Sequence, residues 1–147
     1  MILSNTSKYG LRAVIYLAIK AKGNEKIGIK KIAGDLDIPM PFLGKILQSL
    51  AKHQILSSSK GPHGGFGLAK KPEQIKLLDV IKVIEGDLVF DTCLISLKSC
   101  LKRNKKHTPC PIHYKFDGIR KNIIQFFEKE TIKSISDDIK NHKKIEI

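Results

Sequence analysis

Apolar positions in the first part of the chain recur with a helical period. The pattern predicts a first helix over residues 5 to about 22, capped by side chains from Asn5 to Ser7 and ended by Gly23-Asn24. One apolar stripe along this helix has the spacing i, i+3, i+4 and i+7: Leu11, Val14, Ile15 and Ala18. Such a stripe is typical of an amphipathic helix that packs on a core.

Two further helices are expected next. The segment GIKKIAGDLD predicts a short helix, IPM a tight turn, and a third helix begins near Pro41, because the fixed φ of proline suits the first helical position. The inward positions of the third helix are apolar: Leu43, Ile46, Leu47 and Leu50. Its outward positions are small, polar or basic: Gly44, Lys45, Gln48 and Lys52. Two helices joined by a short turn, the second with an exposed polar face, indicate a helix-turn-helix.

A hairpin is predicted directly after the third helix. In ILSSSKGPHGGFGLAKK, two short strand-like runs flank a turn from Lys60 to Gly65 that is rich in glycine. Its tip carries Lys60 and His63, and its glycines let the backbone approach a phosphate or a groove closely. A hairpin in this place is either the wing of a DNA-binding domain or a structural cap.

The second half of the chain predicts more helices. IKLLDVIKVIEG forms a fourth helix that Gly86 ends. A later helix, running to about Glu130, has an apolar stripe too extensive for a free surface: Phe116, Ile119, Ile123, Phe126 and Phe127. We expect a second subunit to cover that stripe. A capping box from Ser134 to Asp137 predicts a short terminal helix.

These elements predict a mostly α fold with a small β-hairpin: a winged helix-turn-helix followed by a long dimerisation helix. We expect a DNA-binding domain over residues 1–86, a cysteine-rich cluster-binding loop over 87–112, and a dimerisation helix with a C-terminal tail over 113–147.

Charge changes the picture from a generic helical protein to one with a polyanionic partner. The chain has 147 residues and a formal charge of 27 − 14 = +13. Such an excess favours nucleic acid, although a surface that is merely soluble would also carry charge. No apolar run reaches the length of a membrane span, and Arg12 interrupts the apolar amino terminus, so we expect a cytoplasmic protein without a membrane partner.

All three cysteines of the chain lie in one stretch, CLISLKSCLKRNKKHTPCPIH. Cys93, Cys100 and Cys110 are spaced C-x6-C-x9-C, and His113 follows three residues after the last. In a cytosolic protein, an odd number of cysteines indicates thiolate ligands or redox thiols rather than a disulfide framework. Three sulfurs and one imidazole have the right number and chemistry for an iron–sulfur or zinc site.

Several motifs together resemble the Rrf-two family of bacterial winged-helix transcription regulators, which includes IscR-type and NsrR-type sensors. The resemblance rests on SKYGLRAVIYLA, IKKIAGDLDIPMPFLGKILQSL, KGPHGGFGLAK and LLDVIKVIEG, followed by the clustered cysteines in the same order. It implies a homodimer whose long penultimate helices cross, a palindromic double-stranded DNA operator and often an iron–sulfur cluster.

The resemblance also implies a ligand set. In IscR-like members, a histidine three residues after the third cysteine is the fourth ligand of a two-iron cluster, and His113 stands at that position. NsrR-like members instead use a carboxylate from the first helix, where this chain has Lys8. A [2Fe–2S] cluster is therefore favoured and a [4Fe–4S] cluster is the alternative.

Two features of the cysteine stretch depart from the family pattern. The basic insert LKRNKKHTP makes the second interval longer than the family's compact spacing, and His107 within it competes with His113 as the fourth ligand. The cysteines could otherwise serve a cluster-free thiol-based redox regulator, a structural zinc site or a cysteine-dependent redox enzyme.

The candidate DNA contacts fall into three groups. The amino-terminal outward residues of the third helix would meet base edges: Pro41, Gly44, Lys45 and Gln48. Lys52 lies further along the same face. The wing would contribute Lys60, His63 and Gly64, with Lys60 in the place of the family's wing arginine. Backbone contacts would come from the first two helices: Lys8, Arg12, Lys30 and Lys31. IscR-like members have a glutamate where this chain has Gly44, so the operator preference is not transferred.

The hypothesis from the sequence is a dimeric transcriptional repressor whose operator affinity depends on an iron–sulfur cluster sensing iron, redox state or nitric oxide.

Overall fold

The structure is a computed structural model that describes residues 3–87, 89–91 and 111–142. It is mostly helical, with one two-stranded antiparallel hairpin, as the sequence predicts. In chain order, the elements are α1 (Asn5–Lys20), α2 (Ile29–Leu36), α3 (Met40–Lys52), β1 (Leu56–Ser59), β2 (Gly65–Leu68), the 3₁₀ turn η1 (Pro72–Gln74), α4 (Leu77–Glu85), α5 (Pro111–Lys129) and α6 (Ile132–Asn141).

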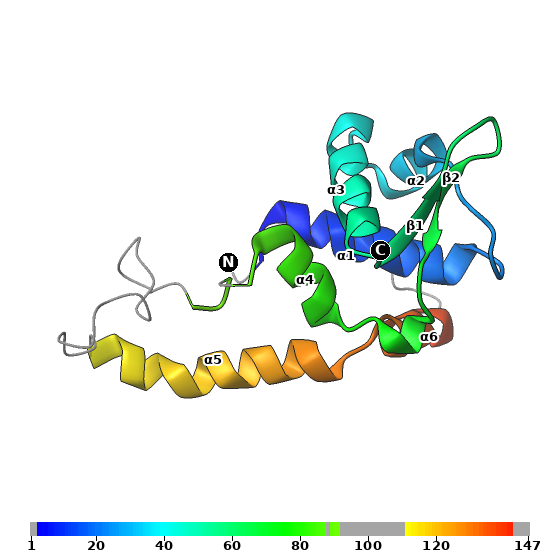
Figure 1. Cartoon of the computed structure of the whole chain (residues 1–147). Coiled ribbons are helices and arrows are strands. Elements are labelled where there is room, and N and C mark those ends of the chain that lie inside the picture. The colour runs from blue at the N-terminus through cyan, green and yellow to red at the C-terminus, as the bar shows by residue number, and fades with distance from the viewer. Residues whose placement is uncertain (1–2, 88, 92–110, 143–147) are drawn as a thin grey trace.

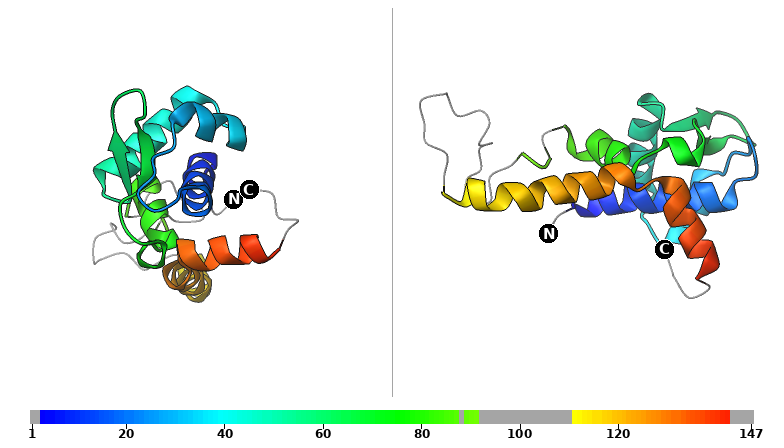
Figure 2. Two further views of the ribbon diagram at one scale, coloured as in Figure 1. Left: turned by 90° about the vertical axis from the view of Figure 1, so that its right-hand side faces the viewer. Right: turned by 90° about the horizontal axis from the view of Figure 1, so that it is seen from below.

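The first helix runs through the middle of the molecule, with α2, α3 and the hairpin on one side and α5 on the other (Figures 1 and 2). Its cap differs from the prediction: the Ser4 hydroxyl accepts the backbone N–H of Ser7 at 3.1 Å, so the cap lies one residue before the expected stretch. The helix also ends at Lys20 rather than near Lys22.

The turn between α2 and α3 is tight because Asp37 takes the left-handed conformation, with a φ of 51°. Ile38, just beyond it, is buried, and the N–H of Ile38 donates to the Ala33 carbonyl at 3.0 Å. The predicted turn and the start of the third helix near Pro41 are confirmed, with Pro39 as the cap of α3.

The hairpin pairs Leu56 with Leu68 and Ser59 with Gly65. A third segment extends it, since Ile27 and Phe66 exchange two backbone hydrogen bonds of 2.9 Å. Gly65 is required at this place, because a Cβ there would lie 2.3 Å from the carbonyl oxygen of Ile27.

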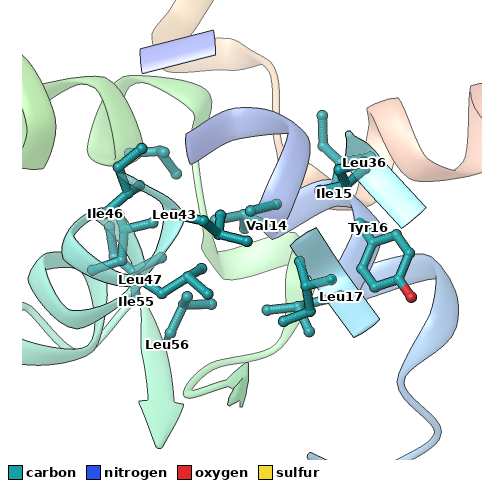
Figure 3. Packing of buried hydrophobic residues seen from close by; sticks show 14 of the residues in the cluster. Val14, Ile15, Tyr16, Leu17, Leu36, Leu43, Ile46, Leu47, Ile55 and Leu56 are labelled. Carbon is teal, nitrogen blue, oxygen red and sulfur yellow. The ribbon is translucent and has the colours of Figure 1, made fainter. Parts of the chain in front are cut away.

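The core lies where α1, α3, α4 and the hairpin meet. Val14 of α1 and Leu43 of α3 lie next to each other in this core (Figure 3), and Leu17 and Leu47 belong to the same fully buried cluster. The predicted inward face of α3 is therefore confirmed.

The carboxy-terminal helix returns to this same core. Backbone hydrogen bonds join the segment before α4 to the α5–α6 junction: Leu77 N–H donates to Glu130 O at 3.0 Å, and Ile132 N–H to Ile75 O at 2.8 Å. Ile132 is fully buried, and α6 packs on α1. The predicted terminal helix exists, but its capping box uses Thr131 and Ser134 rather than the expected pair. The side chains of α6 therefore pack on the core that α1, α3, α4 and the hairpin form.

Candidate DNA-binding surface and metal centre

The outward face of α3 is the largest group of predicted DNA-contact residues that the structure brings together. Four of them are exposed along this helix: Pro41, Lys45, Gln48 and Lys52. The fifth, Gly44, is half-buried. A Cβ on Gly44 would touch only the Cδ1 of Ile29, at 3.4 Å. The opposite face is held in the core, so the polar face of α3 cannot turn inward. A helix held in this way can enter the major groove of DNA.

The wing stands on the same side of α1 as α3 (Figure 1). Lys60 and His63 are exposed in its turn, and Gly64 is half-buried. Gly64 supports the turn geometry, because its N–H donates to the Gly61 carbonyl at 2.9 Å and a Cβ there would lie 2.4 Å from the Ser59 carbonyl oxygen.

The predicted backbone contacts on the first two helices differ in their surroundings. Lys8, Lys30 and Lys31 are exposed, and Lys31 forms an ion pair with Asp35 at 3.2 Å. Arg12 is half-buried, and its guanidinium donates to the carbonyl of Leu36 at 2.8 Å, at the end of α2. Arg12 thus has a structural role in holding α2 on α1.

A second side-chain bond fixes α2 to α1. The Tyr16 hydroxyl donates to the Asp35 carboxylate at 2.5 Å. Burial, together with this hydrogen bond, raises the pKa of Tyr16 to about 12, and the bonds from Tyr16 and Lys31 lower the pKa of Asp35. The helix-turn-helix is therefore oriented by two polar contacts besides its apolar core.

Two exposed apolar residues at the start of α3 were not among the predicted contacts. Phe42 is 61% exposed and Met40 is 43% exposed. The sequence carries a signal for them, since neither fits the inward stripe of the helix.

The long helix α5 exposes a different, apolar surface. Large hydrophobic side chains stand in solvent along it: Ile112, Tyr114, Ile119 and Phe126. A shallow groove is lined by Ile119, Asn122, Ile123, Phe126 and Phe127. The helix α5 also packs on α4. Phe127 of α5 stacks on Phe90, with 5.8 Å between the ring centroids.

Of the four predicted cluster ligands, the structure describes His113 alone. It lies in the first turn of α5, and its Nδ1 is buried without a hydrogen-bond partner within the described ranges. Cys93, Cys100 and Cys110 lie outside the described residues, as does His107. The part of the chain that is described contains no group of three or more metal-ligating side chains. A buried ring nitrogen left unbonded is costly, and a metal bond would satisfy it, so the donor fits the expected site.

Near the same end of the molecule, a carboxylate ties the start of α1 to the end of α4. Glu85 accepts the backbone N–H of Ser4 at 3.0 Å and the hydroxyl of Ser7 at 2.7 Å. Burial opposes its ionisation, but these hydrogen bonds outweigh burial and hold the pKa of Glu85 below its usual range. Just beyond Glu85, Gly86 ends α4 with a φ of 90°, as predicted.

The fold and its exposed polar helix define a winged helix-turn-helix protein. A family model described as Rrf2, iron-dependent transcriptional regulator, matches residues 3–138, so the chain belongs to the Rrf2 (Rrf-two) family. The chain is 35% identical over 135 residues to the "Putative HTH-type transcriptional regulator" of Aquifex aeolicus, which covers 92% of this chain and 91% of that protein.

Solved structures of the same fold carry two different names. The T. potens IscR structure superposes with a TM-score of 0.77 at 23% identity, covering 99% of this chain and 93% of that one. The structure of CymR, the global cysteine regulator of B. subtilis, superposes with a TM-score of 0.75 at 22% identity, covering 92% and 95%.

The family membership makes this chain a transcriptional regulator of a DNA-binding fold. No helix among the described residues is long and apolar enough to cross a bilayer.

Proposed function

We propose that this protein is a cytoplasmic, homodimeric transcriptional repressor that binds a palindromic operator, with an affinity controlled by an iron–sulfur cluster. The observation that carries the DNA part is the exposed face of α3, basic at Lys45 and Lys52 and flanked by the wing. The chain's charge of +13 supports a polyanionic partner.

The apolar surface of α5 supports the homodimer. Ile119 is 54% exposed and Phe126 is 55% exposed, and large apolar side chains grouped on one helix face are seldom left in water. A second copy of α5 offers the same apolar face and would satisfy a twofold interface, in which each patch meets its own copy. Two DNA-binding units held in this way would read a palindromic site.

The cluster would be held by Cys93, Cys100, Cys110 and His113, as a [2Fe–2S] centre in preference to [4Fe–4S]. The buried, unpartnered Nδ1 of His113 and the family's description as iron-dependent support this assignment. When bound, the cluster would supply a linkage among these four side chains that iron shortage, oxidants or nitric oxide can break.

The residues around His113 suggest how the state of the ligands would reach the DNA-binding surface. His113 is in the first turn of α5, α5 packs on α4, and α4 packs on both α1 and α3. A change in the position of α5 would therefore alter the relative placement of the two recognition helices in a dimer. A coupling of about 1–3 kcal/mol between the two sites would change operator affinity about 5- to 150-fold.

The test is anaerobic purification of the full chain, followed by its visible absorption spectrum and analysis of iron and acid-labile sulfide. We expect a coloured protein with iron and sulfide, whose binding to DNA fragments from its own genome changes after treatment with a nitric oxide donor. His113→Ala is expected to lower the cluster content, while the matched variant His107→Ala keeps it.

Other outcomes would overturn parts of the proposal. A colourless protein whose operator affinity changes on thiol oxidation would be the cluster-free thiol regulator. Retention of the cluster in His113→Ala and its loss in His107→Ala would move the fourth ligand to His107. Absence of sequence-selective DNA binding would favour a cysteine-dependent redox enzyme and would refute the regulator itself.

A further inference from the structure

Two of the exposed large hydrophobic residues in the described part of the chain do not belong to the α5 surface. They are Met40 and Phe42, in the first turn of α3, and Phe42 is the more exposed of the two at 61%. An apolar ring left in water gains free energy when a partner covers it. A ring held in this position is therefore ready to be covered by a partner.

The helix geometry keeps this ring on the outside. The core side of α3 is already occupied by four buried side chains: Leu43, Ile46, Leu47 and Leu50. Phe42 lies one position before Leu43 and one turn before Lys45, so it borders the exposed face that carries Lys45. A partner that contacts the ammonium group of Lys45 would therefore also meet the ring of Phe42.

The surroundings of the ring identify the class of partner. Lys45 and Lys52 make the face basic, and no acidic residue lies in the first turn of α3. A face that combines basic and apolar side chains is suited to bind a polyanion that also presents an apolar group. In the major groove of DNA, the apolar group on a base edge is the 5-methyl group of thymine, and phenylalanine is among the side chains that contact it.

We propose that Phe42 packs against a thymine methyl group in each half-site and so sets a preference for thymine at that position. The inference rests on the proposed DNA-binding function and adds a specificity-determining residue to it. Gly44 lies two residues after Phe42 and has no side chain that would hold the helix backbone away from the groove. A Cβ at this position would touch only Ile29. Residues at the amino-terminal end of a recognition helix are the ones that reach base edges.

The test begins with selection of duplexes from a random library by the full wild-type chain. Each thymine of the selected half-site is then replaced by deoxyuridine, which removes only the methyl group, and dissociation constants are measured for the wild type, Phe42→Ala and Phe42→Leu. For the wild type, we expect one replacement to weaken binding about fourfold, the equivalent of about 0.8 kcal/mol for one buried methyl-sized group.

The variants locate the effect. Phe42→Ala should lose the response to that replacement, and Phe42→Leu should keep part of it. The matched variant Lys45→Ala should bind more weakly overall and keep the full response to deoxyuridine. Because the ring is exposed, thermal unfolding of Phe42→Ala should match the wild type and confirm that the variant is folded.

The inference is wrong if deoxyuridine acts equally on the wild type and Phe42→Ala at every position, or if the selected site contains no thymine. In either case the proposed DNA-binding function stands, because a sequence has been selected. If the wild type selects no sequence at all, both the proposed function and this inference fail.

Discussion

The helices α3 and α5 are both amphipathic, but the described residues bury the apolar face of α3 and leave part of the apolar face of α5 in solvent. The apolar stripe of α3 is buried against α1 and the hairpin, and Leu43 and Leu47 have no exposed surface. On α5, by contrast, Ile119 and Phe126 remain more than half exposed. The same periodicity thus serves a core in one helix and a free surface in the other. An apolar stripe therefore predicts that a helix face will be buried, but it does not identify the chain that buries it.

The largest effect should come from the covered stripe. Leu47→Ala is expected to destabilise the fold by about 2–5 kcal/mol, because it removes a fully buried side chain and leaves a cavity in the core. Chemical denaturation monitored by circular dichroism measures this change. The matched truncation Phe126→Ala on α5 should cost the isolated subunit far less, and equal losses would contradict the contrast between the two helices.

The exposed stripe should respond in association instead of folding. Ile119→Glu is expected to weaken self-association at least tenfold, because it would bury an unpaired carboxylate in the proposed apolar interface, and burying an unpaired charge is costly. Sedimentation velocity over a concentration series measures the shift. Gln125→Glu introduces the same charge at an exposed site of the same helix outside the groove. A similar loss in Gln125→Glu would point to net charge as the cause.

The polar face of α3 provides the next test. Lys45→Ala should weaken DNA binding about fivefold to tenfold and, if it contacts a phosphate, reduce the slope of log K against log salt by about 0.9. Fluorescence anisotropy at several salt concentrations measures both quantities. The control variant Lys129→Ala, on the last turn of α5, should change neither the affinity nor the salt slope. An equal effect in this variant would mean that α3 is no more important for DNA binding than α5.

The smallest effect concerns the polar contact at the end of α4, the helix that packs against both α3 and α5. The hydrogen bonds from Ser4 and Ser7 lower the pKa of Glu85, so its contribution is fully present above the unfolded pKa and is lost as pH falls through the folded pKa. We expect Glu85→Gln to cost about 0.5–1 kcal/mol near neutral pH, a discounted value because the carboxylate is only partly buried.

Denaturation at a series of acidic pH values checks this expectation. The difference in unfolding free energy between wild type and Glu85→Gln should shrink as the carboxylate becomes protonated. A difference that stays constant with pH would show that the charge of Glu85 is not involved.

Local patterns along the chain predicted most of the DNA-binding half. The inward positions of α3, the hairpin turn around Gly61 and the end of α4 at Gly86 all follow from side-chain spacing or from positive φ. These features depend on interactions between residues that are close together in the sequence, so they can be predicted without knowledge of the fold. The helix caps were less accurate: hydroxyl residues cluster at Ser4 to Ser7 and at Thr131 to Ser136, and only the backbone geometry selects which one accepts the N–H.

Long-range relations were beyond the sequence. Nothing local indicates that Arg12 donates to the carbonyl of Leu36 or that Glu85 holds the start of α1. The cluster site is still a proposal from the sequence, with His113 as its single described member.

Side-chain spacing along the chain was enough to predict the helices, the apolar face of each helix and the side chains that are candidates for binding. Only the folded chain shows which of those faces are buried by the described residues, and that α6 joins the core through Ile132. The two kinds of feature depend on interactions of different range along the chain. Helical periodicity arises from neighbours three and four residues apart, whereas the burial of a face depends on segments that meet only when the whole chain has folded.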